Sequence, residues 1–392
     1  MLIRDAARAA CLSHSFLRSW RCFPDLNLNL YSLCAKGSQT GGLVSTIDSI
    51  LRNHSGIGLK IFRLHLELDS INRPYVESWL QLAVTPGIEK LTFVNNGISL
   101  TNLCLHHVQI KDDELQCLLS NSPALEELDL YGCPEIVFLK IPCGLQRFSF
   151  LRAMDCCGVQ MIECKAPNLS RLGLSSTKTR LLLGEASQLK DFTLSDTSGV
   201  YYAHAELPSI MPNLERLALY SYDEVNTPML PTKFLYLKHL TIAVTSGAAF
   251  SPSYDYFSLV SFLDASPSLE TLFLDVPKYC LEHESVFESS SHLRQLPKCR
   301  RHDCLKSVKI TGFSSAEGLI ELTCCVVKSA VSLEHLVLDP LHDAIRCYGK
   351  DGKICWPKSK TVLEEAFRTV EAIRTYIEDE VPTTASVTVV EP

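Results

Sequence analysis

Residues 123–133 read PALEELDLYGC, and the six letters LEELDL within them decide the fold. They place leucine at the first, fourth and sixth positions, and this frame, L-x-x-L-x-L with apolar substitutions, recurs ten times along the 392 residues. A frame that recurs this often indicates a repeat protein. The clearest copies begin at Leu125, Leu169, Leu214, Leu237, Leu269 and Leu333. Looser copies begin at Ile88, Leu145, Leu189 and Leu305.

The frame predicts a short strand, because a strand alternates its side chains and sends the second and third apolar positions to one face. One such strand buries too little, so the copies must stack in parallel around a continuous core. The four copies from Leu169 to Leu237 are 20, 25 and 23 residues apart, which is the leucine-rich-repeat range, and the 36 residues from Leu269 to Leu305 indicate a loop insertion. We therefore predict an α/β leucine-rich-repeat solenoid with a curved parallel sheet and with helices and loops on its convex side.

An ordinary α/β domain with leucine-rich strands is the alternative architecture. It would need longer apolar runs and regular helices between the strands. The segments between the frames are instead short, polar and irregular, except that residues 112–122, DDELQCLLSNS, predict a helix with Asp112 or Asp113 as N-cap.

Composition excludes several classes of protein. The net charge is -7 and the acidic and basic residues are interspersed, so no basic stripe indicates a nucleic-acid partner. No run of eighteen apolar residues predicts a membrane span, and Arg4, Asp5 and Arg8 interrupt any signal peptide, although an Arg-bearing start leaves a mitochondrial presequence as an alternative. The 17 cysteines are scattered through apolar segments, which predicts reduced thiols and a cytoplasmic or nuclear location.

Residues 341–392 are predicted to cap the array. The run 361–380, TVLEEAFRTVEAIRTYIEDE, has the apolar spacing of a one-sided helix, which would cover the last repeat and its strand edge. The predicted buried face consists of Val362, Leu363, Ala366, Phe367, Val370, Ile373 and Ile377.

The N-terminal run 4–20 also has helical spacing, with Asp5 as a candidate N-cap. Together with WRCFPDLNLN from Trp20, it resembles the second half of an F-box. The segments SWLQLAVTPGIEKLTF from Ser78, DELQCLLSNSPALEELDLYGCPEI from Asp113 and KAPNLSRLGL from Lys165 resemble plant F-box proteins with leucine-rich repeats of the meiotic F-box type.

This resemblance implies a substrate receptor of a cullin-based ubiquitin ligase. Residues 1–35 would form a partial F-box that binds a Skp-type adaptor, and residues 36–340 would form the repeat array that binds an unknown protein substrate. The adaptor-binding residues would be Leu12, Phe16, Leu17 and Trp20. The chain starts after the Leu-Pro-containing segment and first helix that members of the family carry, so the F-box is predicted to be N-terminally truncated, and a non-ligase scaffold or decoy is the alternative function.

No catalytic or cofactor motif is present: the sequence has no P-loop, no G-x-S-x-G and no H-E-x-x-H. Cys299, His302 and Cys304 are close enough to suggest a metal site, but no second pair has zinc-like spacing. We therefore predict a protein that is not an enzyme and has no cofactor or metal, and that is a monomer apart from its partners.

The binding surface is predicted from the positions that alternate with the buried ones in each strand. At the fifth strand position these include Thr311 and Asp339 in the last repeats. Aromatic and arginine side chains contribute most to interfaces, so they weigh most in the choice of contacts. The predicted partner-binding residues on the concave face are Glu127, Tyr131, Arg216, Tyr220, His239, Phe273 and Asp275.

Overall fold

We analysed a computed structural model of the chain. The structure describes residues 24–29, 43–54, 61–65, 90–92, 101–106, 110–120, 122–184, 188–222, 224, 233–245, 254–276, 285–287, 300–341 and 360–391. The chain divides into two compact units, Met1–Gln188 and Leu189–Pro392, called here unit 1 and unit 2.

Unit 1 is built on parallel strands. One sheet contains β1 (Asp25–Asn29), β2 (Ile61–His65) and β3 (Lys90–Thr92), in that order, and helix α4 (Leu43–Asn53) lies between β1 and β2 in the sequence. A second run of neighbouring strands consists of β4 (Asn102–His106), β5 (Glu127–Tyr131), β7 (Phe150–Met154) and β9 (Arg171–Leu174). Each of these strands pairs in parallel with the next.

A further parallel sheet in unit 1 consists of β6 (Phe138–Ile141), β8 (Met161–Cys164) and β10 (Arg180–Leu182), with β8 in the centre. The predicted helix is confirmed as α6 (Asp112–Ser120). Its N-cap differs from the prediction, because the Asp112 carboxylate accepts the backbone N–H groups of Val137 and Phe138, at 2.8 and 3.0 Å. Asp112 thus connects α6 to the start of β6, and Glu114 accepts the Lys111 N–H at the helix start instead.

The described residues of unit 2 form seven strands in sequence order, each paired in parallel with the next. They are β11 (Asp191–Thr197), β12 (Arg216–Tyr222), β13 (His239–Thr245), β14 (Thr271–Asp275), β15 (Ser307–Thr311), β16 (His335–Asp339) and β17 (Ser386–Val389).

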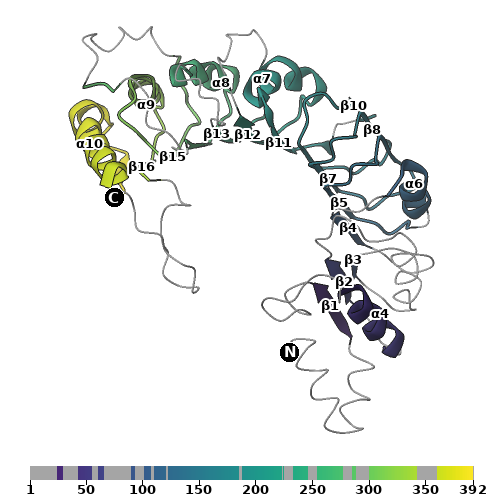
Figure 1. Ribbon diagram of the computed structural model, residues 1–392. Coiled ribbons are helices and arrows are strands. Elements are labelled where there is room, and N and C mark those ends of the chain that lie inside the picture. Colours follow the sequence, from purple (N-terminus) through teal and green to yellow (C-terminus); the bar gives the residue numbers. More distant parts are fainter. Residues whose placement is uncertain are drawn as a thin grey trace. The chain divides into compact units, whose positions relative to one another are not determined.

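The helical elements of unit 2 are α7 (Gly199–Ile210), η3 (Tyr256–Leu259), α8 (Val260–Ala265), α9 (Glu317–Ser329), α10 (Lys360–Tyr376) and η5 (Glu378–Glu380). Figure 1 shows α7, α8, α9 and α10 on the outer side of the arc formed by the strands of this unit. Between the two layers, Leu240 and Ile242 of β13 and Leu272 and Leu274 of β14 face Phe262 of α8 across the core.

Register in unit 2 is fixed by backbone hydrogen bonds at the start of each strand. The Lys190 carbonyl accepts the N–H groups of both Glu215 and Arg216, and the Glu215 carbonyl accepts those of both Lys238 and His239. The same pattern repeats at β14, β15 and β16. Side chains at one position of the repeat therefore form straight rows across the sheet.

A left-handed residue follows the strand in several repeats. Gly132, Asp155 and Gly312 have φ values of 61°, 52° and 67°, and each comes directly after β5, β7 or β15. Glycine adopts this conformation without steric cost, and aspartate tolerates it better than most residues. The turn takes the chain out of the sheet at the same point in each of these repeats.

Nine of the ten frames are confirmed, since a strand begins at the third residue of each. The copy LQRFSF from Leu145 is wrong by three residues, because β7 begins at Phe150 and pairs Leu151 with Leu128 of β5. The correct frame begins at Phe148, which is fully buried, and its third apolar position is the small residue Ala153. An alanine at that position made the true frame hard to see.

Both ends of the chain depart from the prediction. Asp25–Asn29, within the segment expected to be helical, is strand β1, as its alternating sequence DLNLN explains. Helix α10 is confirmed, but Phe367 is 63% exposed, whereas Ala366, Ile373 and Ile377 are buried. The last strand edge is not covered by α10, because β17 follows the helix and pairs with β16.

The cysteines of the described part are mostly free thiols, as predicted, and Cys325 of α9 is an exception because it is disulfide-bonded. Cys133 and Cys156 occupy equivalent positions, one residue beyond the left-handed turn, and both are buried. The Cys133 thiol donates to the Leu105 carbonyl at 3.4 Å and so joins neighbouring repeats.

Replacing Asp112 should weaken unit 1. Asp112→Ala leaves two backbone N–H groups at β6 without their charged acceptor, and we expect a loss of about 1–3 kcal/mol in the free energy of unfolding. Urea denaturation followed by circular dichroism measures it. Asp113→Ala is the matched control, because Asp113 is exposed on the same helix turn. Equal losses in the two variants would contradict the role assigned to Asp112.

Candidate functional site

The first, third and fifth residues of the strands lie on the face opposite the buried second and fourth residues, as the burial patterns of β5, β7 and β14 show. We call this the open face of each unit. In unit 2 it is the face away from the helices (Figure 1). Because the register is continuous, each row of the open face collects one position from successive repeats.

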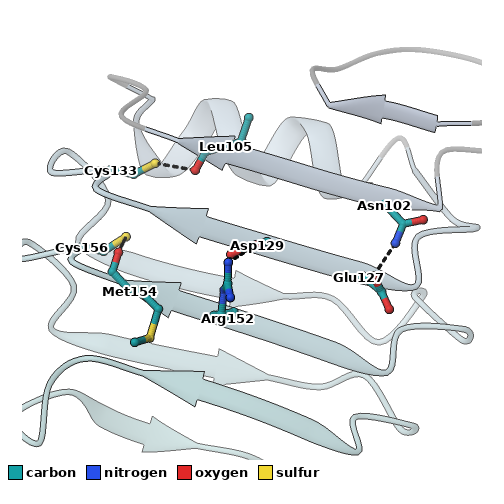
Figure 2. A network of polar contacts seen from close by, with 8 residues as sticks. All are labelled: Asn102, Leu105, Glu127, Asp129, Cys133, Arg152, Met154 and Cys156. Atoms are coloured by element: carbon teal, nitrogen blue, oxygen red, sulfur yellow. Dashed lines mark hydrogen bonds and ion pairs between the residues drawn. The ribbon is translucent and has the colours of Figure 1, made fainter. Parts of the chain in front are cut away.

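On the open face of unit 1, Arg152 of β7 forms a bidentate ion pair with Asp129 of β5, through Nε at 2.7 Å and Nη2 at 2.6 Å (Figure 2). In the register, Arg152 stands between Asp129 of β5 and Gly173 of β9. A Cβ at Gly173 would lie only 3.2 Å from Cγ of Arg152, so glycine leaves room for the arginine stem. The Asp129 carboxylate raises the pKa of Arg152, which keeps the pair ionised.

The neighbouring row of unit 1 is also cross-linked. Glu127 accepts hydrogen bonds from Asn102 on one side and, at 2.9 Å, from Arg171 two strands away on the other. To reach Glu127, the Arg171 guanidinium passes over the Phe150 ring, 4.5 Å from its centroid. A partner protein would have to break these pairs and desolvate the charges before it could use them, which is costly.

Tyr131 closes this face at the end of β5. Its hydroxyl donates a hydrogen bond to the Asp155 carboxylate, and this bond raises the pKa of Tyr131. The Ser175 hydroxyl accepts a hydrogen bond from the Asp155 N–H at 2.7 Å. Asp155 therefore connects the repeat of Tyr131 through its side chain and the repeat of Ser175 through its backbone. Tyr131 is therefore already engaged within the chain.

On the open face of unit 2, the described ion pairs lie at the starts of the strands. Arg216 of β12 binds Asp191 of β11 at 2.9 Å. One position earlier, Glu215 lies between Lys190 at 2.8 Å and Lys238 at 3.7 Å. These contacts are more than a quarter exposed on both sides, so each adds little stability but opposes a slip of the register.

The open face of unit 2 carries aromatic side chains. Tyr220 and Tyr222 of β12 are 44% and 42% exposed. In the register, Tyr220 stands between Ser195 and Ala243, so its ring rises above short neighbours. Within the described residues neither tyrosine hydroxyl has a hydrogen-bond partner.

Two strands away, Phe273 of β14 lies beside Lys309 of β15, whose ammonium group is 5.3 Å from the ring centroid. We call Tyr220, Tyr222 and Phe273 the aromatic patch. Rigid aromatic rings on a fixed backbone lose little conformational entropy on binding, which makes them effective contacts for a protein partner.

The end of β12 that carries the two tyrosines is connected to the start of α7 by buried hydrogen bonds. Glu224, which is 3% exposed, accepts the Val200 N–H at the start of α7 at 2.6 Å and the Ser221 hydroxyl at 2.5 Å. Ser221 in turn accepts the Gly199 N–H at 2.8 Å. Burial raises the pKa of Glu224, although the hydrogen bonds from Ser221 and from the Val200 and Tyr201 N–H groups oppose the shift.

The described residues provide no evident catalytic or metal centre. A cavity of about 10 Å³ between β13, β14 and α8 is lined by apolar side chains and has room for about one water molecule. Within the described ranges no group of three His, Cys, Asp or Glu side chains could hold a metal ion; Cys299 lies outside them, His302 is buried and Cys304 is exposed.

Buried thiols are poor nucleophiles here. Burial raises the pKa of Cys164 and of Cys324 to about 11, and a hydrogen bond with Cys133, together with burial, raises that of Cys156.

None of the helices in the described part of the chain has the length and apolar character that a membrane span requires.

Comparison with known proteins agrees with this architecture. The family model described as At1g61320/AtMIF1, LRR domain, matches residues 50–98 and 94–392. The chain belongs to this leucine-rich-repeat family. The F-box/LRR-repeat protein At3g03360 of Arabidopsis thaliana is 26% identical over 207 residues, which are 50% of this chain and 42% of that relative. The matched segment thus spans less than half the length of the relative.

Membership of the family confirms the predicted leucine-rich-repeat solenoid. The structure places the predicted contact residues on the open faces, and their role in binding stays a prediction. Glu127, Tyr131 and Arg216 are engaged in the contacts described above. His239 shares a hydrogen bond of 2.8 Å with Thr271, and Asp275 accepts the Thr311 hydroxyl at 2.5 Å.

Thr311 and Asp339 were expected to be exposed outward positions and are instead buried: the Thr311 hydroxyl donates to Asp275, and the Asp339 carboxylate accepts the Leu341 N–H. Leu12, Phe16, Leu17 and Trp20 lie outside the described residues.

The sequence reasoning missed two residues of the open faces, Arg152 and Tyr222. Arg152 was missed because the frame of β7 was misplaced. Tyr222 was missed because β12 runs three residues beyond the six-letter frame, although the alternation LALYSY signals it. Lys309 occupies a predicted outward position, but nothing in the sequence indicates its contact with Phe273.

Glu224→Gln should change how stability depends on pH. Since the folded pKa of Glu224 is raised, its stabilisation is complete below the unfolded pKa of about 4.3 and is lost as the pH rises through the folded value. The neutral amide keeps an acceptor for Val200 without a buried charge. We therefore expect the variant to melt higher than the unmodified chain at pH 7, and the two to converge near about pH 4.

Thermal unfolding across a pH series measures this difference. Glu206→Gln, at an exposed position of α7, is the control and should leave the pH dependence unchanged. If Glu224→Gln lowers the melting temperature equally at every pH, the carboxylate is needed for packing alone and its raised pKa has no consequence for stability.

Proposed function

We propose that the chain is a non-enzymatic protein-binding module that holds a partner protein on the aromatic patch of unit 2. The exposed pair Tyr220 and Tyr222 carries this proposal. Tyrosine is among the residues that dominate interface energies, and a strand presents its side chains at fixed spacing. The open face of unit 1 is a weaker candidate, because Arg152 and Arg171 are already paired with carboxylates.

We further propose that the partner is a protein to be ubiquitinated, and that the chain is a substrate receptor of a cullin ubiquitin ligase. Two observations support this. The segment from Arg4 through Trp20 resembles part of an F-box, and a relative is named an F-box/LRR-repeat protein. The Skp-type adaptor of the ligase would bind the segment before β1, through Leu12, Phe16, Leu17 and Trp20.

Removing both tyrosine rings should weaken partner binding. We expect Tyr220→Ala combined with Tyr222→Ala to reduce retention of specific partners by about tenfold or more, because interface aromatics often contribute 2 kcal/mol or more. Affinity capture from plant extract, with quantitative mass spectrometry, measures it. Tyr201→Ala is the matched control, since Tyr201 is 51% exposed on α7 of the same unit. Equal retention by all three proteins would contradict the aromatic patch as the binding site.

Adaptor binding is tested separately. An immobilised Skp-type adaptor should retain the chain, and Leu17→Ala with Trp20→Ala should reduce retention by about tenfold through lost apolar burial. Phe138→Ala is the control, because Phe138 is 45% exposed on β6. A version with a complete F-box placed before Arg4 is the positive control. If that version alone is retained, the receptor proposal fails, and a chain that still captures its partner is an interaction scaffold or decoy.

A further inference from the structure

Strand β17 lies at one edge of the strands of unit 2, with β16 on one side. In the described part of the chain no strand pairs with its other side. The N–H groups of Ser386 and Val390 donate to Glu334 and Leu338 carbonyls, so even-numbered residues point their backbone groups toward β16. The N–H and C=O groups of Val387 and Val389 therefore point away from the sheet, at the outer edge.

The side chains of β17 suit a second strand. Val387 and Val389 share one face and are only half-buried, while Ser386 and Thr388 are exposed on the other face. Short uncharged strands with unpaired edges readily add another strand. Nothing in Ser386–Val389 opposes this, since the segment holds no charge and no proline.

Helix α10 leaves apolar surface at the same end of the unit, where it is the last helix of its layer (Figure 1). One flank of α10 faces α9 and the segment just before it, because Cys324 of α9 donates to the Tyr376 carbonyl and Ser315 donates to Glu365. Leu363, Phe367 and Val370 follow the spacing of one helix stripe on the other flank. Phe367 is 63% exposed, so this stripe lacks full cover.

We propose that β17 pairs antiparallel with β17 of a second copy of the chain, about a two-fold axis at Thr388. In this register Val387 faces Val389 of the second copy, and their outward N–H and C=O groups form hydrogen-bonded pairs on both sides of the axis. The same alignment joins four half-buried valines on one face. Glu391 falls opposite Ala385 of the second copy, so no like charges meet.

A second copy fits this edge better than an unrelated strand because the edge is complementary to itself, as a two-fold interface requires. The two α10 stripes lie on the helix side of the same axis and add apolar area. A contact of one strand and one helix per copy is small, so the dimer is weak and its population rises with concentration.

The register can be tested by charge at its centre. Thr388 faces Thr388 of the second copy in a non-hydrogen-bonded pair, where side chains are closest. We expect Thr388→Lys alone, or Thr388→Glu alone, to raise the dimer dissociation constant by about five- to tenfold. An equimolar mixture of the two variants should restore or exceed the original association. Sedimentation equilibrium of the full chain over a concentration series measures all three.

Thr383→Lys, in the turn before β17, adds the same charge outside the strand and is the matched control. It should associate like the unmodified chain. A mass equal to that of the monomer at every concentration overturns the proposal. So does unchanged association of both Thr388 variants, which would place the interface elsewhere. Restored association in the mixture also shows that both variants fold, while a mixture that stays monomeric excludes a register centred on Thr388.

Discussion

The parallel register of the strands is the constraint on which the other features of this protein depend. Carbonyls just before the strands, such as those of Lys190 and Glu215, accept two N–H groups from the start of the next strand, which fixes the alignment of successive repeats. Once aligned, leucines at the second and fourth strand positions form the core, and the positions between them form rows on the open face. The ion pairs of unit 1 and the aromatic patch of unit 2 are both formed by side chains at these outward strand positions.

Most of the fold could be predicted because one residue type dominates the core positions. At nine of the ten predicted frames the strand began where expected, but β4 was not predicted although residues 100–105, LTNLCL, carry the same frame. The prediction failed where a small residue took a core position, as Ala153 does in β7, and where a strand lacked the leucine frame, as SVTV does in β17. Phe367 was misplaced because periodicity identifies the apolar stripe of a helix but not how much of it the neighbouring helix covers.

The candidate site was less predictable, for a different physical reason. Alternation tells which side chains face outward, and it placed Tyr220 and Phe273 correctly on the open face. It does not tell which charges meet, because Arg171 reaches Glu127 across an intervening strand, 44 positions away in the sequence. Nor does it show that Glu224, outside every frame, supports β12 from the buried side. Such contacts depend on side-chain length and on loop paths, which a local pattern does not contain.

The left-handed residue that ends β5, β7 and β15 has a consequence for how such a chain can diverge. Because the turn leads the chain out of the sheet at one fixed point, the connecting segments can lengthen or shorten without displacing the strands, as the 21 residues from Phe148 to Leu169 and the 28 from Leu305 to Leu333 illustrate. Each strand can then exchange its outward side chains independently of its neighbours. In proteins built this way, the binding surface can therefore change one strand at a time, while the parallel sheet and its core are conserved.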